Sequence, residues 1–136
     1  MDRRTFLLST LAVTAAGPVL AASGERYKPG LVKAKLEKGE IVFVDFYTDW
    51  CTTCRSQQRT INALKAENPA FEKNISFVSV DWDRFSGSKL SRELKIPRRS
   101  TLVALSKDGE IGRIVAGTRK SDIKALMDKA LSAAVA

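Results

Sequence analysis

The stretch FVDFYTDWCTTCRS, residues 43–56, places two cysteines three positions apart, directly after an apolar run. Cys51 and Cys54 are the only cysteines of the 136-residue chain. The apolar run spans 41–47 and is typical of a strand buried on both faces, as in a sheet covered by helices. The pattern of 51–67 predicts a helix. The first cysteine is therefore expected where a strand gives way to a helix.

Two neighbouring cysteines can staple a fold, hold a metal or exchange electrons with another thiol. A staple is disfavoured, because closing so small a loop removes little entropy from the unfolded chain. A metal site needs further ligands, and the chain has no histidine and no third cysteine. The absence of histidine also excludes Ser-His and Cys-His catalytic pairs. A CxxC beside a βαβ pattern therefore favours redox chemistry.

The expected start of a helix assigns a role to each cysteine. Free N–H groups and the positive dipole end of the helix stabilise a thiolate at Cys51, so we expect its pKa to lie below that of a free cysteine and its sulfur to be exposed and nucleophilic. Cys54 lies one turn further on and is expected to be more buried. It is placed to attack a mixed disulfide at Cys51 and release the reduced partner.

The other predicted elements complete an α/β fold. They are helices over 28–38 and around Leu90 and Leu94, strands over 75–80, 100–106 and 110–115, and a last helix with an apolar stripe of Ile123, Leu126, Met127, Ala130 and Leu131. Asp108-Gly109 is a hairpin signal between the last two strands. The order predicts a mixed four-stranded sheet with helices on both faces.

The N-terminus has the pattern of a secretory signal peptide over 1–21, which leaves a domain over 22–136. Arg3 and Arg4 precede an apolar stretch over 6–16, and small residues follow. RRTFL resembles the twin-arginine signature; ordinary secretion is the alternative. The apolar stretch is shorter than the roughly 20 residues that an uncleaved anchor needs. We therefore expect the domain in an oxidising compartment, a bacterial periplasm.

The formal net charge of +8 is compatible with acidic partners or membrane surfaces, or with a merely solvated basic surface. The basic residues are spread along the chain and form no aromatic-interleaved patch, so no nucleic-acid site is expected.

The segment FVDFYTDWCTTC resembles the active-site segment of the thioredoxin superfamily, in which an apolar strand, an Asp and a Trp precede CxxC. Residues 30–135 follow the family order, and the wording DFYTDWC is similar to periplasmic thioredoxin-like reductants of the DsbD kind. The resemblance implies that Cys51 attacks, that Cys54 resolves and that Trp50 shapes the contact surface. It also implies that Asp45 is the family's buried acid.

The position of Asp45 agrees with that role. A carboxyl inside an apolar strand loses hydration, which raises its pKa, and a carboxyl poised near neutrality can take the proton of Cys54. The alternative is a residue at the strand end with its side chain in solvent. The lysine that often lies near this acid in thioredoxins is Ser79 here.

The family also has a loop with a cis-proline that faces the CxxC and holds the substrate backbone. Ile96 and Pro97 are the candidates, because X–Pro is the only common site of a cis bond. The chain departs from the family here, since IPRRSTLV is about three residues longer before the strand. Arg98 and Arg99 consequently fall near the expected groove, where they either steer acidic partners or stand as solvated loop residues.

The sequence therefore predicts a secreted thiol–disulfide oxidoreductase that reduces protein disulfides as a monomer, with no metal and no cofactor. A periplasmic reductant needs an electron donor, and we expect a membrane protein of the DsbD/CcdA kind. The alternatives are an oxidase or isomerase of the same fold, or a copper or zinc carrier that borrows ligands from a partner. Thr52-Thr53 does not decide the direction, because it matches neither the Gly-Pro of thioredoxins nor the Pro-His of strong oxidants.

Overall fold

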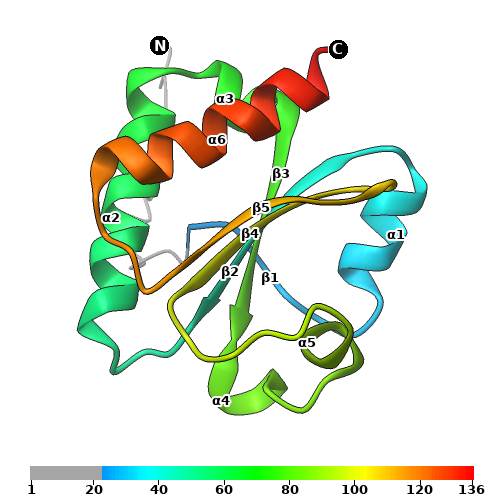
Figure 1. The fold of residues 1–136 in the computed structure, drawn as a ribbon, viewed down its shortest axis with the longest axis vertical. Coiled ribbons are helices and arrows are strands. Elements are labelled where there is room, and N and C mark those ends of the chain that lie inside the picture. The colour runs from blue at the N-terminus through cyan, green and yellow to red at the C-terminus, as the bar shows by residue number, and fades with distance from the viewer. Residues whose placement is uncertain (1–22) are drawn as a thin grey trace, which may run out of the picture.

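The computed structural model describes residues 23–136, so the predicted signal peptide over 1–21 lies outside the described residues. Its strands are β1 (Glu25–Arg26), β2 (Ile41–Tyr47), β3 (Ile75–Asp81), β4 (Thr101–Ser106) and β5 (Gly109–Val115). Its helices are α1 (Leu31–Glu37), α2 (Thr52–Glu67), α3 (Ala70–Asn74), α4 (Trp82–Phe85), α5 (Lys89–Glu93) and α6 (Lys120–Ala134) (Figure 1). None of the helices within this range has the length and apolar character that a membrane crossing needs.

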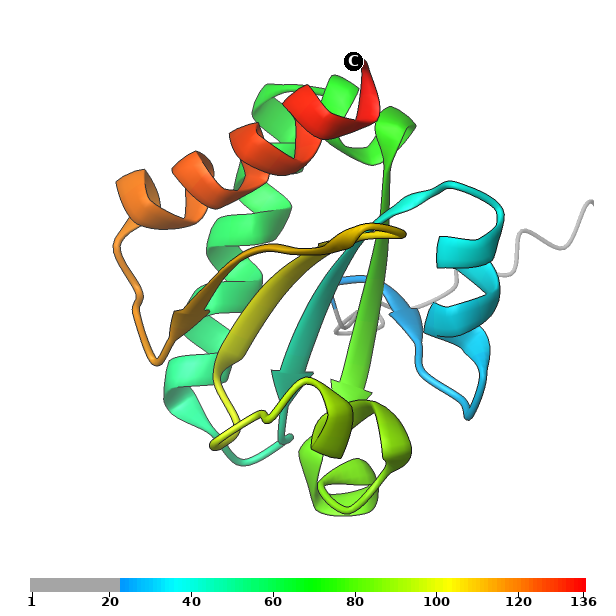
Figure 2. The same ribbon diagram turned by 45° about the vertical axis from the view of Figure 1, so that its right-hand side comes forward.

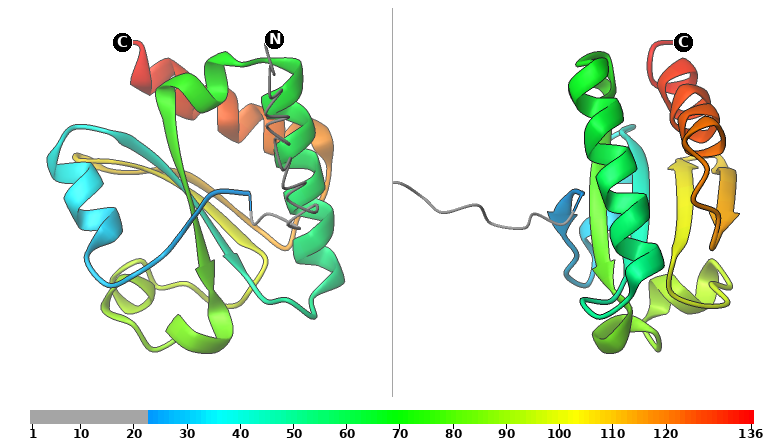
Figure 3. Two further views of the ribbon diagram at one scale, coloured as in Figure 1. Left: turned by 180° about the vertical axis from the view of Figure 1, so that it is seen from behind. Right: turned by 90° about the vertical axis from the view of Figure 1, so that its left-hand side faces the viewer.

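The sheet has the strand order β1-β3-β2-β4-β5. β2 is parallel to β3 and antiparallel to β4, and the hairpin of β4 and β5 is antiparallel. The sheet is mixed, as predicted, but it has five strands and not four. The additional strand, β1, pairs in parallel with the outer side of β3 (Figure 3, right). Its two residues are too few to show the alternation that identifies a strand in a sequence.

Helices cover both faces of the sheet, as the sequence predicted (Figure 1). Alternate residues of β2 point to opposite faces. Phe43 packs with residues of α2, α3 and α6 in one core cluster. Val44 lies in the second cluster, against which side chains of α1, α4 and α5 pack. Both faces of the central strand are therefore buried, which explains its continuous apolar sequence.

The ends of the elements follow local signals in the sequence. The predicted hairpin is confirmed, because β5 begins at Gly109, whose φ of 133° few other residues adopt. The first helix is shorter than predicted and begins only after Gly30, whose φ is 87°. The short helices α3 and α4 were not predicted. The N-cap of α4 is Asp81, whose side chain accepts a hydrogen bond of 3.0 Å from the N–H of Asp83.

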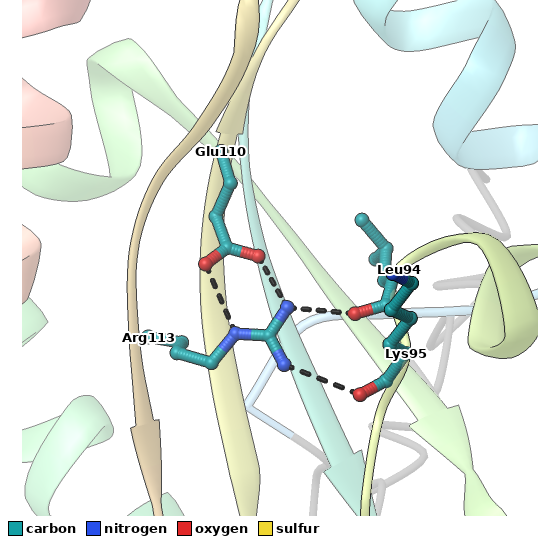
Figure 4. Close-up of polar contacts among 4 residues, drawn as sticks. All are labelled: Leu94, Lys95, Glu110 and Arg113. Atoms are coloured by element: carbon teal, nitrogen blue, oxygen red, sulfur yellow. Dashed lines mark hydrogen bonds and ion pairs between the residues drawn. The ribbon is translucent and has the colours of Figure 1, made fainter.

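Arg113 of β5 holds the start of the loop that connects α5 to β4 (Figure 4). Its guanidinium donates to the carbonyl oxygens of Leu94, at 2.7 Å, and Lys95, at 3.4 Å. The same group forms two hydrogen bonds with the carboxylate of Glu110, which orients it. The last carbonyls of a short helix lack intrahelical partners, so this contact satisfies them and fixes the direction in which the loop leaves α5.

Candidate active site

Cys51 and Cys54 form a disulfide at the start of α2, immediately beyond the end of β2. Cys51 is the N-cap residue of the helix, and its Sγ accepts a hydrogen bond of 3.2 Å from the backbone N–H of Cys54. The strand-to-helix position predicted from the sequence is confirmed. An N–H that points at the Cys51 sulfur stabilises negative charge on it, just as it stabilises the side-chain oxygen of an ordinary N-cap residue.

The two cysteines differ less in exposure than the sequence suggested. Cys54 is fully buried, as expected, but Cys51 is only 3% exposed. The expectation of an openly exposed nucleophile is therefore wrong. Neighbouring structure covers almost all of Cys51, so a partner disulfide has to approach it within a narrow range of directions.

Ser100 contacts both sulfurs of the disulfide. Its hydroxyl oxygen lies 3.2 Å from Sγ of Cys51 and 3.0 Å from Sγ of Cys54. Ser100 is the last residue of the loop between α5 and β4, and this loop and the turn before α2 lie at the same, lower end of the sheet in Figure 2. Ser100 is fully buried. Sequence reasoning did not single it out.

The backbone of Ser100 is held in a left-handed conformation, with φ of 63°. Its N–H donates to the carbonyl of Phe46 at 2.7 Å, and its carbonyl accepts from the N–H of Ala116 at 2.9 Å. The buried side chain of Gln57 donates to the same carbonyl at 2.9 Å. A non-glycine residue with positive φ needs such support from its surroundings. These bonds fix where the hydroxyl points.

The expectation of a cis-proline is corrected by this geometry. No peptide bond within residues 23–136 is cis, so the bond before Pro97 is trans. Pro97 is exposed, and Ile96 is buried in the core cluster beside α5. The loop continues for three residues after Pro97, and it is the last of these, Ser100, that contacts the cysteines. The roles of Ile96 and Pro97 in substrate binding stay predictions.

Trp50 provides the exposed surface next to the disulfide. Its side chain is 59% exposed, and its indole N–H donates to the carboxylate of Asp83 at 2.9 Å. The guanidinium carbon of Arg99 lies 4.3 Å from the centre of its ring, a cation–π contact. The Nε of Arg99 is buried without a hydrogen-bond partner. Of the two loop arginines, Arg99 is therefore part of the site, whereas Arg98 is exposed.

Asp45 is buried, with 1% of its surface exposed, so the alternative of a solvated side chain is wrong. Its Oδ2 accepts hydrogen bonds from Ser23, at 2.9 Å, and from Gln58, at 3.3 Å, while Oδ1 has no partner. Burial raises the pKa of Asp45 to about 6, and these hydrogen bonds and the charge of Lys65 oppose the rise. Gln58 follows Cys54 by one helical turn, which places the carboxyl behind the second cysteine.

The sequence interpretation of Asp45 as a lone acid missed the groups around it. Ser79 does lie beside Asp45 in the neighbouring strand, where the family has a lysine. The positive charge that acts on Asp45 belongs instead to Lys65 of α2. The ammonium group of Lys65 donates a hydrogen bond to the carbonyl of Ser23. Burial lowers the pKa of Lys65, while Glu72 and Asp45 raise it. One sequence signal was available: Cys54, Gln58 and Lys65 repeat at helical spacing along one face.

The model of the thioredoxin family matches residues 21–129 of the chain. The chain belongs to the thioredoxin family. The family and the paired cysteines make it a thiol–disulfide oxidoreductase. Within residues 23–136, no three His, Cys, Asp or Glu side chains are grouped as metal ligands would be.

Several thioredoxins resemble the chain. Thioredoxin H3 of Arabidopsis thaliana is 27% identical over 117 residues, which cover 86% of this chain and 93% of the relative. The mitochondrial thioredoxin-2 of Schizosaccharomyces pombe is 28% identical over 97 residues, 71% of this chain and 65% of the relative. The crystal structure of Trxlp from Edwardsiella tarda is 27% identical, has a TM-score of 0.65, and matches 75% of this chain and 96% of its own.

A match of another kind is the thiol:disulfide interchange protein DsbD of Pseudomonas fluorescens. It is 24% identical over 102 residues, which cover 74% of this chain. The match spans only 17% of DsbD. This thioredoxin-family chain therefore resembles one segment of that protein, and the plain thioredoxins match a larger share of their own length.

Proposed function

We propose that this oxidoreductase reduces disulfides of other proteins in a periplasm and receives its electrons from a membrane thiol reductant of the DsbD/CcdA kind. The observation that carries the proposal is the position of the Cys51 sulfur, which caps α2 and accepts the N–H of Cys54. A helix N-terminus favours a thiolate, and the thiolate is the attacking form in disulfide exchange.

The exchange has two steps. The Cys51 thiolate attacks a substrate disulfide; a mixed disulfide forms, the substrate S–S bond breaks, and one substrate sulfur leaves as a thiolate. Cys54 then gives its proton to Asp45 and attacks the sulfur of Cys51. The Cys51–Cys54 disulfide forms, and the second substrate sulfur leaves and is protonated. Two electrons have then passed to the substrate.

The carboxyl of Asp45 is suited to that proton transfer. Its pKa of about 6 lies close to neutrality because burial disfavours the carboxylate. It is therefore largely ionised at neutral pH and accepts a proton without a large penalty.

The compartment and the donor have separate support. The N-terminal residues 1–21 have the pattern of a signal peptide. The match to a segment of DsbD favours a donor of that class. The formal net charge of +8 would favour contact with an anionic membrane surface.

Trapping tests the exchange. In the Cys54→Ser variant the first cysteine still attacks, but nothing resolves the product, so mixed disulfides with substrate proteins should accumulate and disappear on reduction. Cys51→Ser is the matched control and should trap nothing. Equal adduct formation by both variants, or by neither, would contradict the proposed order of attack.

The direction of electron flow is measured independently. The Cys51–Cys54 pair is equilibrated with glutathione buffers, and a reductant should have a potential well below that of glutathione. A value well above it would instead favour the oxidase or isomerase.

The compartment is tested with a fusion. Residues 1–30 are joined to a reporter enzyme that works only after export, and they should carry it across the membrane. A second fusion, in which Arg3 and Arg4 are replaced by lysine, tests the twin-arginine route and should lose export if that route is used.

A further inference from the structure

The hydroxyl of Ser100 is the one polar side-chain group within residues 23–136 that contacts both redox sulfurs, at 3.2 Å and 3.0 Å. These two contacts join residues 49 and 46 positions apart in the sequence. Nothing in the chemistry described above uses this group. A hydroxyl buried against two redox sulfurs has one of two roles. It either forms hydrogen bonds with the reacting atoms or only fills the space beside them.

A hydroxyl has one hydrogen to donate and two lone pairs that accept. Between two sulfurs, it can donate to only one of them at a time. A thiolate is a far better acceptor than a neutral sulfur, because hydrogen bonds to charged groups are roughly twice as strong as neutral ones. The Ser100 hydrogen therefore goes to whichever sulfur carries the charge, and a lone pair faces the other.

The position of the hydroxyl does not depend on the disulfide. The backbone of Ser100 is held by Phe46, Ala116 and Gln57. Arg113 fixes the beginning of the same loop through Leu94 and Lys95. Reduction of the cysteines breaks none of these bonds, so the hydroxyl stays within reach of both sulfurs.

We propose that Ser100 is a catalytic residue that donates a hydrogen bond first to the thiolate of Cys51 and then to the thiolate of Cys54. In the reduced protein the O–H points to Cys51. After attack, the Cys51 sulfur is part of a mixed disulfide and carries no charge, which frees the O–H. When Cys54 has lost its proton to Asp45, the O–H turns to Cys54. The inference rests on the proposed exchange at the same pair.

The donor also affects the balance between oxidised and reduced protein. A hydrogen bond to a thiolate stabilises the reduced state, whereas the neutral sulfurs of the disulfide gain little from it. Ser100 therefore shifts the pair toward the reduced form and raises its potential. Charged side chains on the surrounding elements include Asp45 of β2, Asp49 of the turn before α2, Arg55 and Lys65 of α2, Asp83 of α4, and Arg98 and Arg99 of the loop. All of them remain when Ser100 is replaced.

The test replaces the hydroxyl and titrates Cys51 alone, in protein that also carries Cys54→Ser. Thiolate formation is followed by ultraviolet absorbance against pH. Loss of a hydrogen bond to a charged group should raise the pKa of Cys51 by about one unit in Ser100→Ala. With both cysteines present, the equilibrium constant with glutathione should favour the oxidised form by about tenfold more, which corresponds to about 30 mV.

Two further variants separate the hydroxyl from the backbone. Ser100→Gly also lacks the hydroxyl but relaxes the left-handed conformation at φ of 63°, so it should behave like Ser100→Ala. Thr48→Val removes another buried hydroxyl, in the turn before α2, that has no hydrogen-bond partner and so bonds to neither sulfur. This matched control should leave the pKa of Cys51 unchanged.

An unchanged pKa of Cys51 in both folded Ser100 variants would overturn the inference. A shift in Ser100→Ala that Ser100→Gly reverses would also overturn it, because the cause would then be backbone strain. The titration needs no substrate. A wild-type protein that reduces no protein disulfide would therefore refute the proposed function, whereas the Ser100 variants decide the hydrogen bond separately.

Discussion

The hydroxyl of Ser23 donates a hydrogen bond of 2.9 Å to Oδ2 of Asp45, and so joins the segment before the first strand to the acid of the central strand. Both residues are buried. The carbonyl of Ser23 accepts a hydrogen bond from Lys65. Asp45 is therefore connected through one serine to a partly exposed cation, and the N-terminal segment helps to set its protonation.

Asp45 should make the protein less stable as the pH rises. Its pKa is about 6 in the folded chain and 3.8 in the reference state. Between these values the folded state binds more protons than the unfolded state, so the free energy of unfolding falls with increasing pH, by at most about 3 kcal/mol. Asp45→Asn has no titrating proton and should lack this decline.

The measurement is urea unfolding of both oxidised proteins at several values between about pH 4 and about pH 7. The wild type should lose stability relative to the variant up to about pH 6 and then run parallel to it. Asn still offers an oxygen to Ser23 and Gln58, so the fold should persist. Curves that stay parallel over the whole range would mean that Asp45 does not have a raised pKa.

Ser23→Ala should move the pH dependence of disulfide reduction upward. The hydrogen bond from Ser23 stabilises the carboxylate and lowers the pKa of Asp45. Without it, that pKa should rise above 6 by about one unit, and the inflection in the rate should follow. Rates of single-turnover reduction against pH provide the measurement. Ser56→Ala, on the half-buried side of α2, serves as the control.

The sequence identified the elements that carry their own local signals. The CxxC, the hairpin at Asp108-Gly109 and the apolar stripe of α6 are patterns within a few residues, and each was located correctly. Asp45 was identified because a carboxyl is conspicuous in an apolar strand. Its burial follows from the central position of β2, which has a strand on either side.

The residues that the sequence did not reveal act across long separations. Ser100 meets the cysteines because the loop before β4 reaches the start of α2, and its φ of 63° is held by hydrogen bonds with Phe46 and Ala116. Serines in loops are ordinary, so no local pattern distinguishes this one. Ser23 precedes a strand of two residues, and its partner is 22 positions away.

Gly24→Ala should destabilise the protein through a contact with the neighbouring strand. A Cβ at Gly24 would lie 2.4 Å from the backbone C and O atoms of Phe77, which cannot move without disturbing β3. Overpacking of this kind costs about 1–3 kcal/mol. Gly87→Ala is the matched control, because a Cβ there meets nothing within 4 Å. Thermal melts of the two variants should differ, and equal melting temperatures would show that β1 shifts freely.

Arg99 should favour substrates with acidic residues beside the disulfide. Its guanidinium lies on the ring of Trp50, next to Cys51, and none of the ion pairs within the described residues includes it. Arg99→Gln should therefore lower kcat/KM for a peptide disulfide flanked by glutamates by about two- to fivefold, the range of a partly exposed ion pair. A peptide flanked by glutamines should be little affected.

The control is Arg98→Gln, which removes the same charge from the adjacent, exposed position. If overall charge steers the substrate, both variants should lose the same amount, and the loss should shrink in salt. A loss confined to Arg99→Gln would assign the preference to the guanidinium on Trp50, and an equal loss in both would refute it.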